Sequence, residues 1–219
     1  TGKISNLSNS IGKRTFSFMK GDLCDIQEIR SSLKDINVVF HMAADPEVRT
    51  GFENPRSSYN ENIRNTFYLL EEIRKSSVKK IVFASSSAVY GDATIIPTPE
   101  SYGPLLPISA YGASKLACEA YLSSYCNNYG IEGYIIRPAN VIGSRGRHGV
   151  TWDFINKLKE TPDKLHVLGN GKQRKSYIHV SDAVDGFFHS MQKVAKKVEI
   201  YNLGSEDSID VMTIAKIVI

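Results

Sequence analysis

Residues 80–87 read Lys80-Ile81-Val82-Phe83-Ala84-Ser85-Ser86-Ser87, and this stretch decides the fold class. After its first lysine it is an unbroken apolar run, and it ends in three hydroxyl side chains. An apolar run without polar alternation is typical of a parallel strand that is buried on both faces at the centre of a sheet. Two further runs of this kind occur at 36–40 and 134–136. We therefore expect three central strands of one parallel sheet.

Amphipathic helical patterns separate these runs. Apolar residues recur at steps of three and four over 63–73 and over 113–121, and Gly130 supplies a stop for the second pattern. Strand, helix and strand repeated in this way predict right-handed crossovers with helices on both faces. The predicted fold class is α/β, with a doubly wound parallel sheet. After Asn140 the elements expected are helices at 152–159 and from Asp182 and Asp210, and strands at 177–180 and 198–202.

The composition excludes several classes of protein. The chain has 219 residues, 42% of them hydrophobic and 23% charged, which excludes wholesale disorder. Its net charge of +4 is too small and scattered to predict a nucleic-acid groove. No apolar run approaches the roughly 18 residues of a membrane helix, so we expect no membrane partner. Cys24, Cys118 and Cys126 form neither a disulfide framework nor a metal-ligand spacing, so we expect reduced thiols, no metal and a cytoplasmic location.

A phenol and an ammonium lie one helical turn apart in Tyr111-Gly112-Ala113-Ser114-Lys115. This pair opens a predicted helix, one crossover beyond the strand that ends in the three serines. Because ligands bind at the carboxyl ends of the strands in an open α/β sheet, the phenol, the ammonium and a serine hydroxyl form a candidate acid–base group. We predict that the Lys115 cation lowers the pKa of Tyr111 from about 10. The alternative is that Tyr111 only packs and the serines only end a strand.

A series of motifs in a fixed order extends this pattern from Asn6 to the last residue. The motifs are Asn6-Leu7-Ser8, Gly21-Asp22-Leu23, Val39-Phe40-His41-Met42-Ala43-Ala44, Asn62 with Thr66, residues 83–91, residues 111–115, Arg137-Pro138-Ala139-Asn140-Val141-Ile142-Gly143, residues 169–173 and residues 177–182. With them the chain resembles the extended short-chain dehydrogenase/reductases. It is most similar to the NAD-dependent nucleotide-sugar epimerase/dehydratase family, and within it to the UDP-glucose 4-epimerases.

The resemblance implies a fold, a cofactor and an activity. Residues 1–143 are expected to form an NAD-binding domain with a Rossmann-type sheet. Residues 144–219 are expected to form a mixed region that contributes to the substrate site and to the last strands and helices of the sheet. The implied reaction is 4-epimerisation of a nucleotide sugar of the UDP-glucose/UDP-galactose type through transient oxidation at C4 by NAD. The family also implies a homodimer formed through the helices at 63–73 and 113–125.

The resemblance further assigns roles to individual residues. Tyr111, Lys115 and Ser86 are expected to be catalytic, with Ser85 and Ser87 as neighbouring alternatives for the serine. Besides Tyr111 and Lys115, the expected NAD contacts are Asn6, Asp22 and Leu23 after the third strand, Met42, Ala43 and Ala44 after the fourth, Asn62, Ser85, Pro138 and Ala139. The expected contacts of the sugar nucleotide are Ser86, Ser87, Asn140, Arg147, His148 and Lys175, with Arg145 as a further candidate. An exposed basic loop is the alternative interpretation of Arg145, Arg147 and His148.

The sequence departs from the family pattern at positions that bind the cofactor and phosphate. It has no glycine-rich pyrophosphate loop and no strand before one, and Ser5 stands where the family carries an acid. Glu61 occupies a cofactor position that is often Asn or Thr. Lys175, with Arg174 beside it, replaces a phosphate-binding arginine, which keeps the charge but loses the bidentate geometry. Both ends look cut, so either the chain is a fragment of a longer protein or its cofactor site is incomplete.

Ala88 distinguishes activities within the family. Sugar 4,6-dehydratases and decarboxylases carry an acid at this position, just before Val-Tyr-Gly, because their chemistry needs an additional acid–base group. Epimerisation needs none, so we favour a 4-epimerase. The alternatives are a dehydratase or reductase of the same family, a catalytically silent nucleotide-binding protein, and a structural or RNA-associated member, against which the complete set of Tyr111, Lys115 and Ser86 argues.

Overall fold

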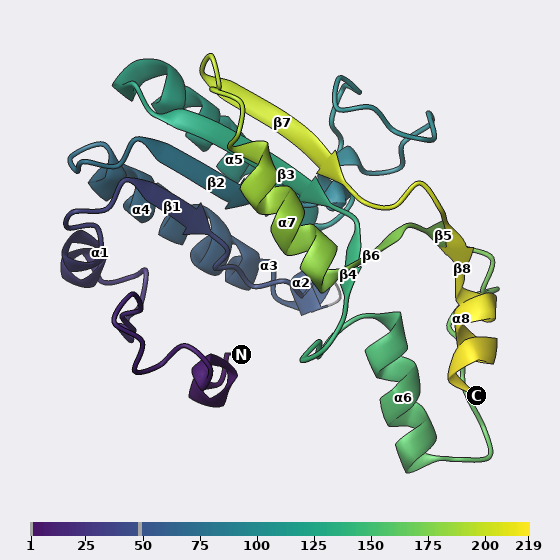
Figure 1. Ribbon diagram of the computed structural model, residues 1–219. Helices are drawn as coiled ribbons and strands as arrows, with labels where there is room; N and C mark the ends of the chain where they lie inside the picture. Colours follow the sequence, from purple (N-terminus) through teal and green to yellow (C-terminus); the bar gives the residue numbers. More distant parts are fainter. Residues whose placement is uncertain (1, 48–49) are drawn as a thin grey trace.

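A four-stranded parallel sheet forms the centre of the computed structural model, which describes residues 2–47 and 50–219. The strands lie in the order β1-β2-β3-β7, and each neighbouring pair is parallel (Figure 1). Their bounds are β1 Val38–His41, β2 Lys80–Ala84, β3 Glu132–Pro138 and β7 Val198–Leu203. The three apolar runs of the sequence are therefore parallel strands of one sheet, as predicted.

Helices cover both faces of this sheet (Figure 1). One face carries α1 (Ile26–Ser32), α4 (Asn65–Ile73) and α5 (Ala110–Tyr129), and the other carries α7 (Val180–Ser190). Alternate residues of β2 enter the two cores: Ile81 and Phe83 pack on the side of α4 and α5, and Val82 packs on the side of α7 with Phe187. The predicted α/β class with a doubly wound parallel sheet is confirmed.

The helix α5 begins and ends at residues that the sequence indicates. The Ser109 hydroxyl caps it by accepting a hydrogen bond from the Gly112 N–H at 3.0 Å. Gly130 follows the last helical residue with a φ of +69°, a left-handed conformation that glycine adopts without strain. The start of the helix at Ala110 places Tyr111 in its first turn.

A π-helix precedes α4 and takes over the beginning of the helix predicted at 63–73. The short helices α2 (Thr50–Glu53) and α3 (Pro55–Ser57) lead into this π-helix, η2 (Ser58–Arg64), and α4 begins at Asn65. Asn62 lies within η2 and is 1% exposed. Insertions of this type are frequent at functional sites.

Beyond β3 the chain forms two small sheets and another apolar cluster. β4 (Asn140–Ile142) pairs in parallel with β6 (Tyr177–His179), and β5 (Arg174–Lys175) pairs antiparallel with β8 (Ile209–Asp210). α6 (Val150–Glu160) packs against α8 (Val211–Val218) around Phe154 and Ile214. β7 lies between these elements in the sequence but pairs with β3. The domain boundary at residue 143 stays a prediction.

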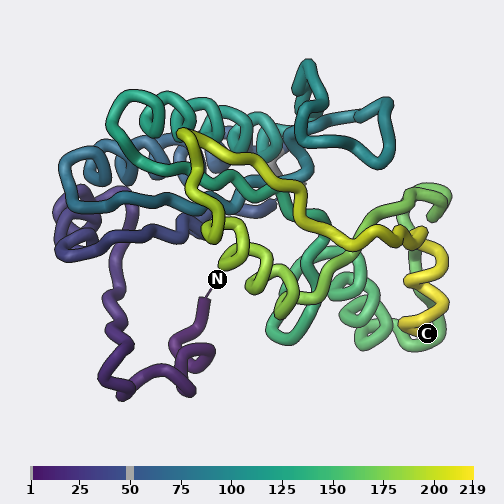
Figure 2. Tube along the Cα trace, turned by 45° about the horizontal axis from the view of Figure 1, so that its top comes forward, coloured from purple at the N-terminus to yellow at the C-terminus, as the bar shows by residue number. Residues whose placement is uncertain are grey.

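The N-terminal segment differs from the expectation. Among residues 2–25 only the 3₁₀ helix η1 (Ile4–Leu7) and turns form, so the prediction that Asp22 and Leu23 follow a strand is wrong. Within the described chain β1 pairs with β2 alone and lies at the edge of the sheet, not at its centre. Both differences have one cause. Residues 2–25 run apart from the sheet, so they form no strand before Asp22 and leave the outer edge of β1 unpaired (Figures 1 and 2).

None of the helices in the part of the chain that the structure describes is long and apolar enough to cross a membrane.

Leu122 and Leu106 offer a test of how α5 is placed. Leu122 is 0% exposed between α5 and the sheet, whereas Leu106 is 69% exposed in the loop before α5. Leu122→Ala should lower the free energy of unfolding by about 2–5 kcal/mol, because it removes buried contacts and leaves a cavity. Leu106→Ala deletes the same atoms at the surface and should change this free energy by no more than about 0.5 kcal/mol. Chemical denaturation measures both, and equal losses would contradict the placement.

Candidate active site

The Tyr111 phenol and the Ser86 hydroxyl meet at the carboxyl end of β2. Tyr111 stands in the first turn of α5, and Ser86 follows β2 directly. The Ser86 hydroxyl lies close enough to the phenol to lower the pKa of Tyr111. The Ser86 oxygen also accepts a hydrogen bond from Ala88 N–H at 3.1 Å, and so caps the 3₁₀ turn η3 (Ser87–Tyr90). This turn fixes the Ser86 side chain toward the start of α5.

The three neighbouring serines take different directions. Ser85 is 3% exposed, and its hydroxyl donates a hydrogen bond to the Glu119 carboxylate of α5, inside the protein. Ser87 is exposed at the start of η3. Ser86 is the serine that the structure brings to Tyr111. The expected contact of Ser85 with the cofactor has to compete with its bond to Glu119.

Lys115 lies one turn after Tyr111 and is 3% exposed. Its ammonium donates a hydrogen bond to the Ala84 carbonyl at 2.7 Å and lies 4.8 Å from the centre of the Phe83 ring and 5.9 Å from that of Tyr111. Burial lowers the pKa of Lys115 to about 8, although Cys118 and Glu119 act in the opposite direction. A protonated lysine has three N–H donors, so Lys115 keeps donor capacity beyond the Ala84 bond.

The predicted lowering of the Tyr111 pKa by Lys115 is wrong for this structure. Burial of the phenol raises the pKa of Tyr111, and the charge of Asp45 raises it further. The nearby Ser86 hydroxyl lowers this pKa, but it does not offset burial. The cause is desolvation, because a half-buried phenolate loses the water that would stabilise its charge. The Lys115 ammonium is oriented by the Ala84 carbonyl at the end of β2.

Asp45 is a residue of this site that the sequence analysis did not identify. It lies in the loop after β1, where its N–H donates to the Asn62 side-chain oxygen at 2.7 Å and its carbonyl accepts from the Asn62 amide at 3.2 Å. The same amide donates to the Ser114 hydroxyl at 2.8 Å. Asn62, expected to contact NAD, therefore ties the loop after β1 to α5. Asp45 directly follows Ala43 and Ala44 in the sequence, and this position is the signal that could have drawn attention to it.

Other predicted residues lie at the carboxyl ends of the same parallel strands. Met42 and Ala43 are exposed and Ala44 is half-buried after β1. Pro138 ends β3, and Ala139 N–H donates to the Leu203 carbonyl at 2.7 Å. The side-chain amide of Asn140 donates to the Ser176 carbonyl at 3.0 Å. The structure thus gathers the residues predicted around the reacting end of the cofactor at one edge of the sheet, the edge where ligands bind in such folds.

The remaining predicted residues lie farther from Tyr111 along the chain and form no hydrogen bond with it among the described residues. The carbonyl of Asn6 accepts from Arg145 at 2.9 Å. The carboxylate of Asp22 accepts from the N–H of Cys24 at 2.8 Å, and this bond lowers the pKa of Asp22, while Leu23 packs on the main core. Three predicted substrate contacts in the second part of the chain are exposed. They are Arg147 and His148, between β4 and α6, and Lys175 on β5.

Glu119 and Arg137 are the other residues near the site that the sequence analysis did not assign. They form a buried ion pair between α5 and β3, with side chains 5% and 2% exposed. A signal was available for Arg137, whose charge directly follows the buried apolar run 134–136. Glu119 lies off the apolar stripe over 113–121, so the helical pattern did not point to its burial.

Comparison with known proteins places the chain among nucleotide-sugar enzymes. Residues 3–204 match the NAD dependent epimerase/dehydratase family. A putative UDP-glucose 4-epimerase of Methanocaldococcus jannaschii is 36% identical over 194 residues, which make up 86% of this chain and 62% of that protein. The human dTDP-D-glucose 4,6-dehydratase is 29% identical over 216 residues, 97% of this chain and 61% of that protein. The chain thus spans about three fifths of the length of these curated relatives.

Solved structures agree with this comparison. A crystal structure of a UDP-galactose 4-epimerase is 41% identical with a TM-score of 0.83, covering 95% of this chain and 70% of that one. A UDP-glucuronic acid 4-epimerase from Bacillus cereus, in complex with UDP-glucuronic acid and NAD, is 27% identical with a TM-score of 0.89, covering 98% of this chain and 68% of that one.

The buried Lys115 predicts a pH dependence of stability. Its pKa is lowered from 10.5 to about 8 on folding, so between these pH values the unfolded chain binds more protons at this site than the folded chain does. The stability of the wild type relative to Lys115→Met should therefore rise by about 1–3 kcal/mol as pH increases over this window. Denaturation at several pH values measures this, with Lys79→Met as the matched change at an exposed lysine. A difference that does not vary with pH would contradict the burial of the ammonium.

Proposed function

The chain belongs to the NAD-dependent epimerase/dehydratase family, and we propose that it is a nucleotide-sugar 4-epimerase of the UDP-glucose/UDP-galactose type. The observation that carries this proposal is that Tyr111, in the first turn of α5, Ser86, directly after β2, and the buried Lys115 come together at the carboxyl end of the sheet. Identities of 36% and 41% with proteins named as UDP-sugar 4-epimerases support it.

The residues present fit the ribose and nicotinamide end of NAD. Lys115 has a buried ammonium with donors to spare, the centre of the Tyr111 ring lies 5.9 Å from it, and Ala43 leaves the strand end open to a backbone approach. Lys115 would hold the ribose hydroxyls, and Pro138 and Ala139 would flank the nicotinamide. When bound, NAD supplies a reversible hydride acceptor for C4 of the sugar and a positive ring beside Tyr111.

The chain's own residues move the proton. Tyr111, as phenolate, accepts the proton of the C4 hydroxyl, and the Ser86 hydroxyl near the phenol relays or stabilises that proton. The raised pKa of Tyr111 keeps the phenol protonated before ligands bind, so ionisation has to accompany binding. Lys115 and the positive cofactor ring favour the phenolate at that stage. After the 4-keto sugar has rotated to present its other face to the cofactor, the same phenol returns the proton to the C4 oxygen.

Binding of the sugar nucleotide is proposed for the residues around this pair. Ser87 and Asn140 are nearest in sequence to the strand ends that carry Ser86 and Ala139. Arg147, His148 and Lys175 add positive or ionisable groups suited to a diphosphate. Ser87, Arg147, His148 and Lys175 are exposed and Asn140 is half-buried, which supports access of a ligand to them.

A 4,6-dehydratase is the second candidate, because the chain is 29% identical to the human dTDP-D-glucose enzyme. That chemistry needs an additional acid just before Val-Tyr-Gly, and this chain has Ala88 there. The absence of an acid at this position favours epimerisation. A catalytically silent nucleotide-binding protein is a third candidate, which an activity measurement separates from both.

A homodimer through α4 and α5 and a location in the cytoplasm complete the proposal. Both helices contribute aromatic side chains to one cluster, in which the Phe67 and Tyr121 rings lie 5.7 Å apart, and Tyr121 is 43% exposed. Such exposed aromatic residues are common at protein interfaces.

The proposed activity is tested by product analysis with the full-length protein. Incubation with UDP-galactose and NAD should give UDP-glucose without net accumulation of NADH. A 4-keto-6-deoxy sugar product would instead identify a dehydratase, and net NADH formation an oxidising enzyme. Absence of any turnover by a protein that binds NAD would favour the silent binding protein.

Tyr111→Phe tests the acid–base role in the same assay. Removing the phenol oxygen should lower kcat by about 10²–10⁴-fold, the range for general acid–base groups. Tyr129→Phe, at the other end of α5 and 50% exposed, is the matched control and should retain wild-type activity. Equal activity of the two variants would remove Tyr111 from the mechanism.

A further inference from the structure

Behind the Tyr111–Ser86 pair lies a buried ion pair that the proposed chemistry does not use. The Arg137 side chain donates to both oxygens of the Glu119 carboxylate, from Nε at 3.0 Å and from Nη2 at 2.7 Å. Neither group is more than 5% exposed. A bidentate pair of this kind fixes the orientation of the two side chains as well as the distance between them. Its two parallel hydrogen bonds hold the guanidinium and carboxylate planes in line with each other.

The Glu119 end of this pair reaches the strand end that carries Ser86. One carboxylate oxygen accepts both the Arg137 bond and the hydroxyl bond of Ser85, the residue immediately before Ser86. The Arg137 end reaches the far side of the same turn, where Nη1 donates to the Tyr90 hydroxyl at 2.9 Å. Tyr90 in turn donates to Asn202 of β7 at 2.7 Å. The ion pair thus contacts the strand end just before η3, through Ser85, and the last residue of η3, through Tyr90.

One face of α5 makes successive contacts with this turn. A Cβ added at Gly112 would lie 2.6 Å from the Ala88 carbonyl oxygen, so the helix backbone closely approaches η3 there. Lys115 bonds the Ala84 carbonyl, and Glu119 bonds Ser85. The spacing of residues 112, 115 and 119 is that of one helix face. Tyr111 is therefore fixed relative to Ser86 by the contacts of its own helix.

Stability alone does not account for the pair. A buried ion pair loses the hydration of both charges, and well-packed apolar residues of similar volume often serve stability equally well. A pair that joins β3, α5 and the serine turn does something that apolar residues cannot, because it sets the direction of the Ser85 hydroxyl.

We propose that Glu119, held by Arg137, is a positioning residue that fixes Ser86 opposite Tyr111 through its hydrogen bond with Ser85. This rests on the proposed function only in that the Tyr111–Ser86 pair carries the proton. Glu119 touches neither substrate nor cofactor in this account, and its effect on the reaction passes entirely through the position of Ser86.

The main test is Ser85→Ala, which removes one hydroxyl and leaves the Glu119–Arg137 pair in place. We expect kcat to fall by between about tenfold and about 10²-fold, while KM changes little. The upper figure is the loss that a small misplacement of a reacting group can cause. Glu119→Gln is the second variant and should act in the same direction. Ser190→Ala is the control for the first, since Ser190 is 8% exposed on α7 and donates to the Phe187 carbonyl.

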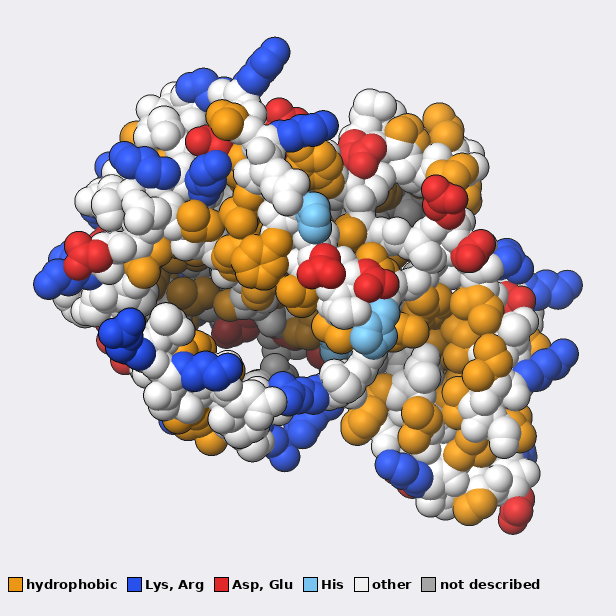
Figure 3. All heavy atoms as spheres, viewed as in Figure 1, with side chains coloured by type: hydrophobic (Ala, Val, Ile, Leu, Met, Phe, Trp, Pro, Cys, Tyr) orange, Lys and Arg blue, Asp and Glu red, His pale blue; other side chains and the backbone are white. Residues whose placement is uncertain are grey.

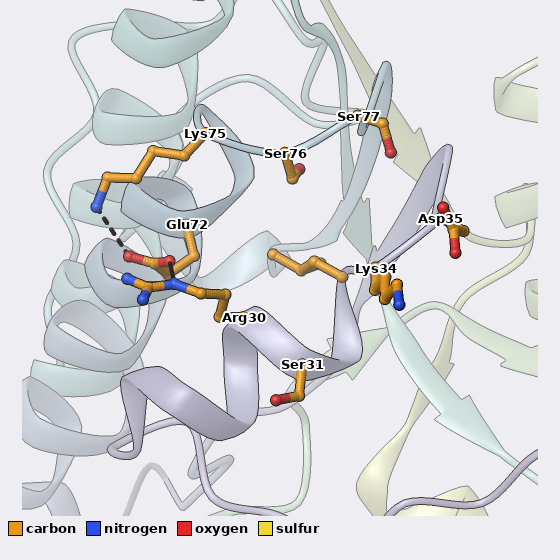
Figure 4. A pocket seen from close by; sticks show the side chains of 9 residues that line it. Arg30, Ser31, Lys34, Asp35, Glu72, Lys75, Ser76 and Ser77 are labelled. Carbon is orange, nitrogen blue, oxygen red and sulfur yellow. Dashed lines mark hydrogen bonds and ion pairs between the residues drawn. The ribbon is translucent and has the colours of Figure 1, made fainter.

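Glu72→Gln is the matched control for the charged residue. Glu72 is also a buried carboxylate, 4% exposed, held by Arg30 at 2.9 Å and by Lys75 at 2.8 Å. It lines a surface pocket between α1 and α4 that is built around these ion pairs (Figure 4). β2 begins near this pocket and ends at the site. The pocket therefore lies at the amino end of the strands, and the site lies at their carboxyl end. Glu72→Gln should weaken the fold but leave kcat unchanged.

Two readouts separate positioning from a general structural effect. The nearby Ser86 hydroxyl lowers the pKa of Tyr111, so displacement of Ser86 in Ser85→Ala should move the Tyr111 titration, and the acid limb of the kcat profile, to higher pH. The titration is followed by phenolate absorbance, with Tyr111→Phe subtracted, and needs no turnover. In a Ser86→Ala background, Ser85→Ala should have almost no further effect on kcat, because the two changes break one chain of contacts.

These results distinguish the inference from the proposed function. Unchanged kcat and an unchanged Tyr111 titration in Ser85→Ala would overturn the inference, even if the wild type epimerises the sugar. An equal loss of kcat with and without Ser86 would also overturn it, because Glu119 would then act elsewhere. If the wild type has another activity or none, the proposed function fails, and the shift of the Tyr111 titration still decides the inference.

Discussion

The close approach of α5 to the end of β2 is the constraint on which the site depends. Gly112 leaves no room for a side chain against Ala88, and Lys115 bonds the last carbonyl of the strand. Tyr111 is next to Gly112 on the helix, and Ser86 lies between Ala84 and Ala88 on the other side. The same contacts therefore bring the phenol and the hydroxyl close together. The sheet then adds the ends of β1 and β3 at the same edge, where a ligand can reach all of them.

Burial gives this site its electrostatic character. It lowers the pKa of Lys115 to about 8 and raises that of Tyr111, so both groups are shifted toward their neutral forms. The neighbouring His41 is buried too, its pKa lowered to about 3 first by desolvation and then by the Lys115 charge, and its ring nitrogen lies 2.8 Å from the Thr66 hydroxyl. Charge is thus expensive at the strand ends. Positive charge on a bound ligand would favour the Tyr111 phenolate there, which would couple its ionisation to binding.

Sequence patterns predicted the sheet, the helices and the central pair, because each depends on local spacing. The unbroken apolar runs identified β1, β2 and β3, and the step of four residues placed Tyr111 and Lys115 on one helix. The sign of the Tyr111 pKa shift was not predictable in this way, since it depends on how deeply the phenol is buried. Neither was the place of β1 at the sheet edge, which depends on whether the preceding segment, residues 2–25, pairs with it. The charges of Glu119 and Arg137 were visible, but their pairing across α5 and β3 requires the three-dimensional fold.

The central claim is that Tyr111 and Ser86 serve a reversible oxidation at C4 of the sugar. The most direct measurement follows a deuterium placed at C4 of UDP-galactose through turnover with NAD. The account predicts a primary isotope effect and UDP-glucose that retains the deuterium at C4. Loss of the deuterium to water, or its appearance at C6, would contradict it.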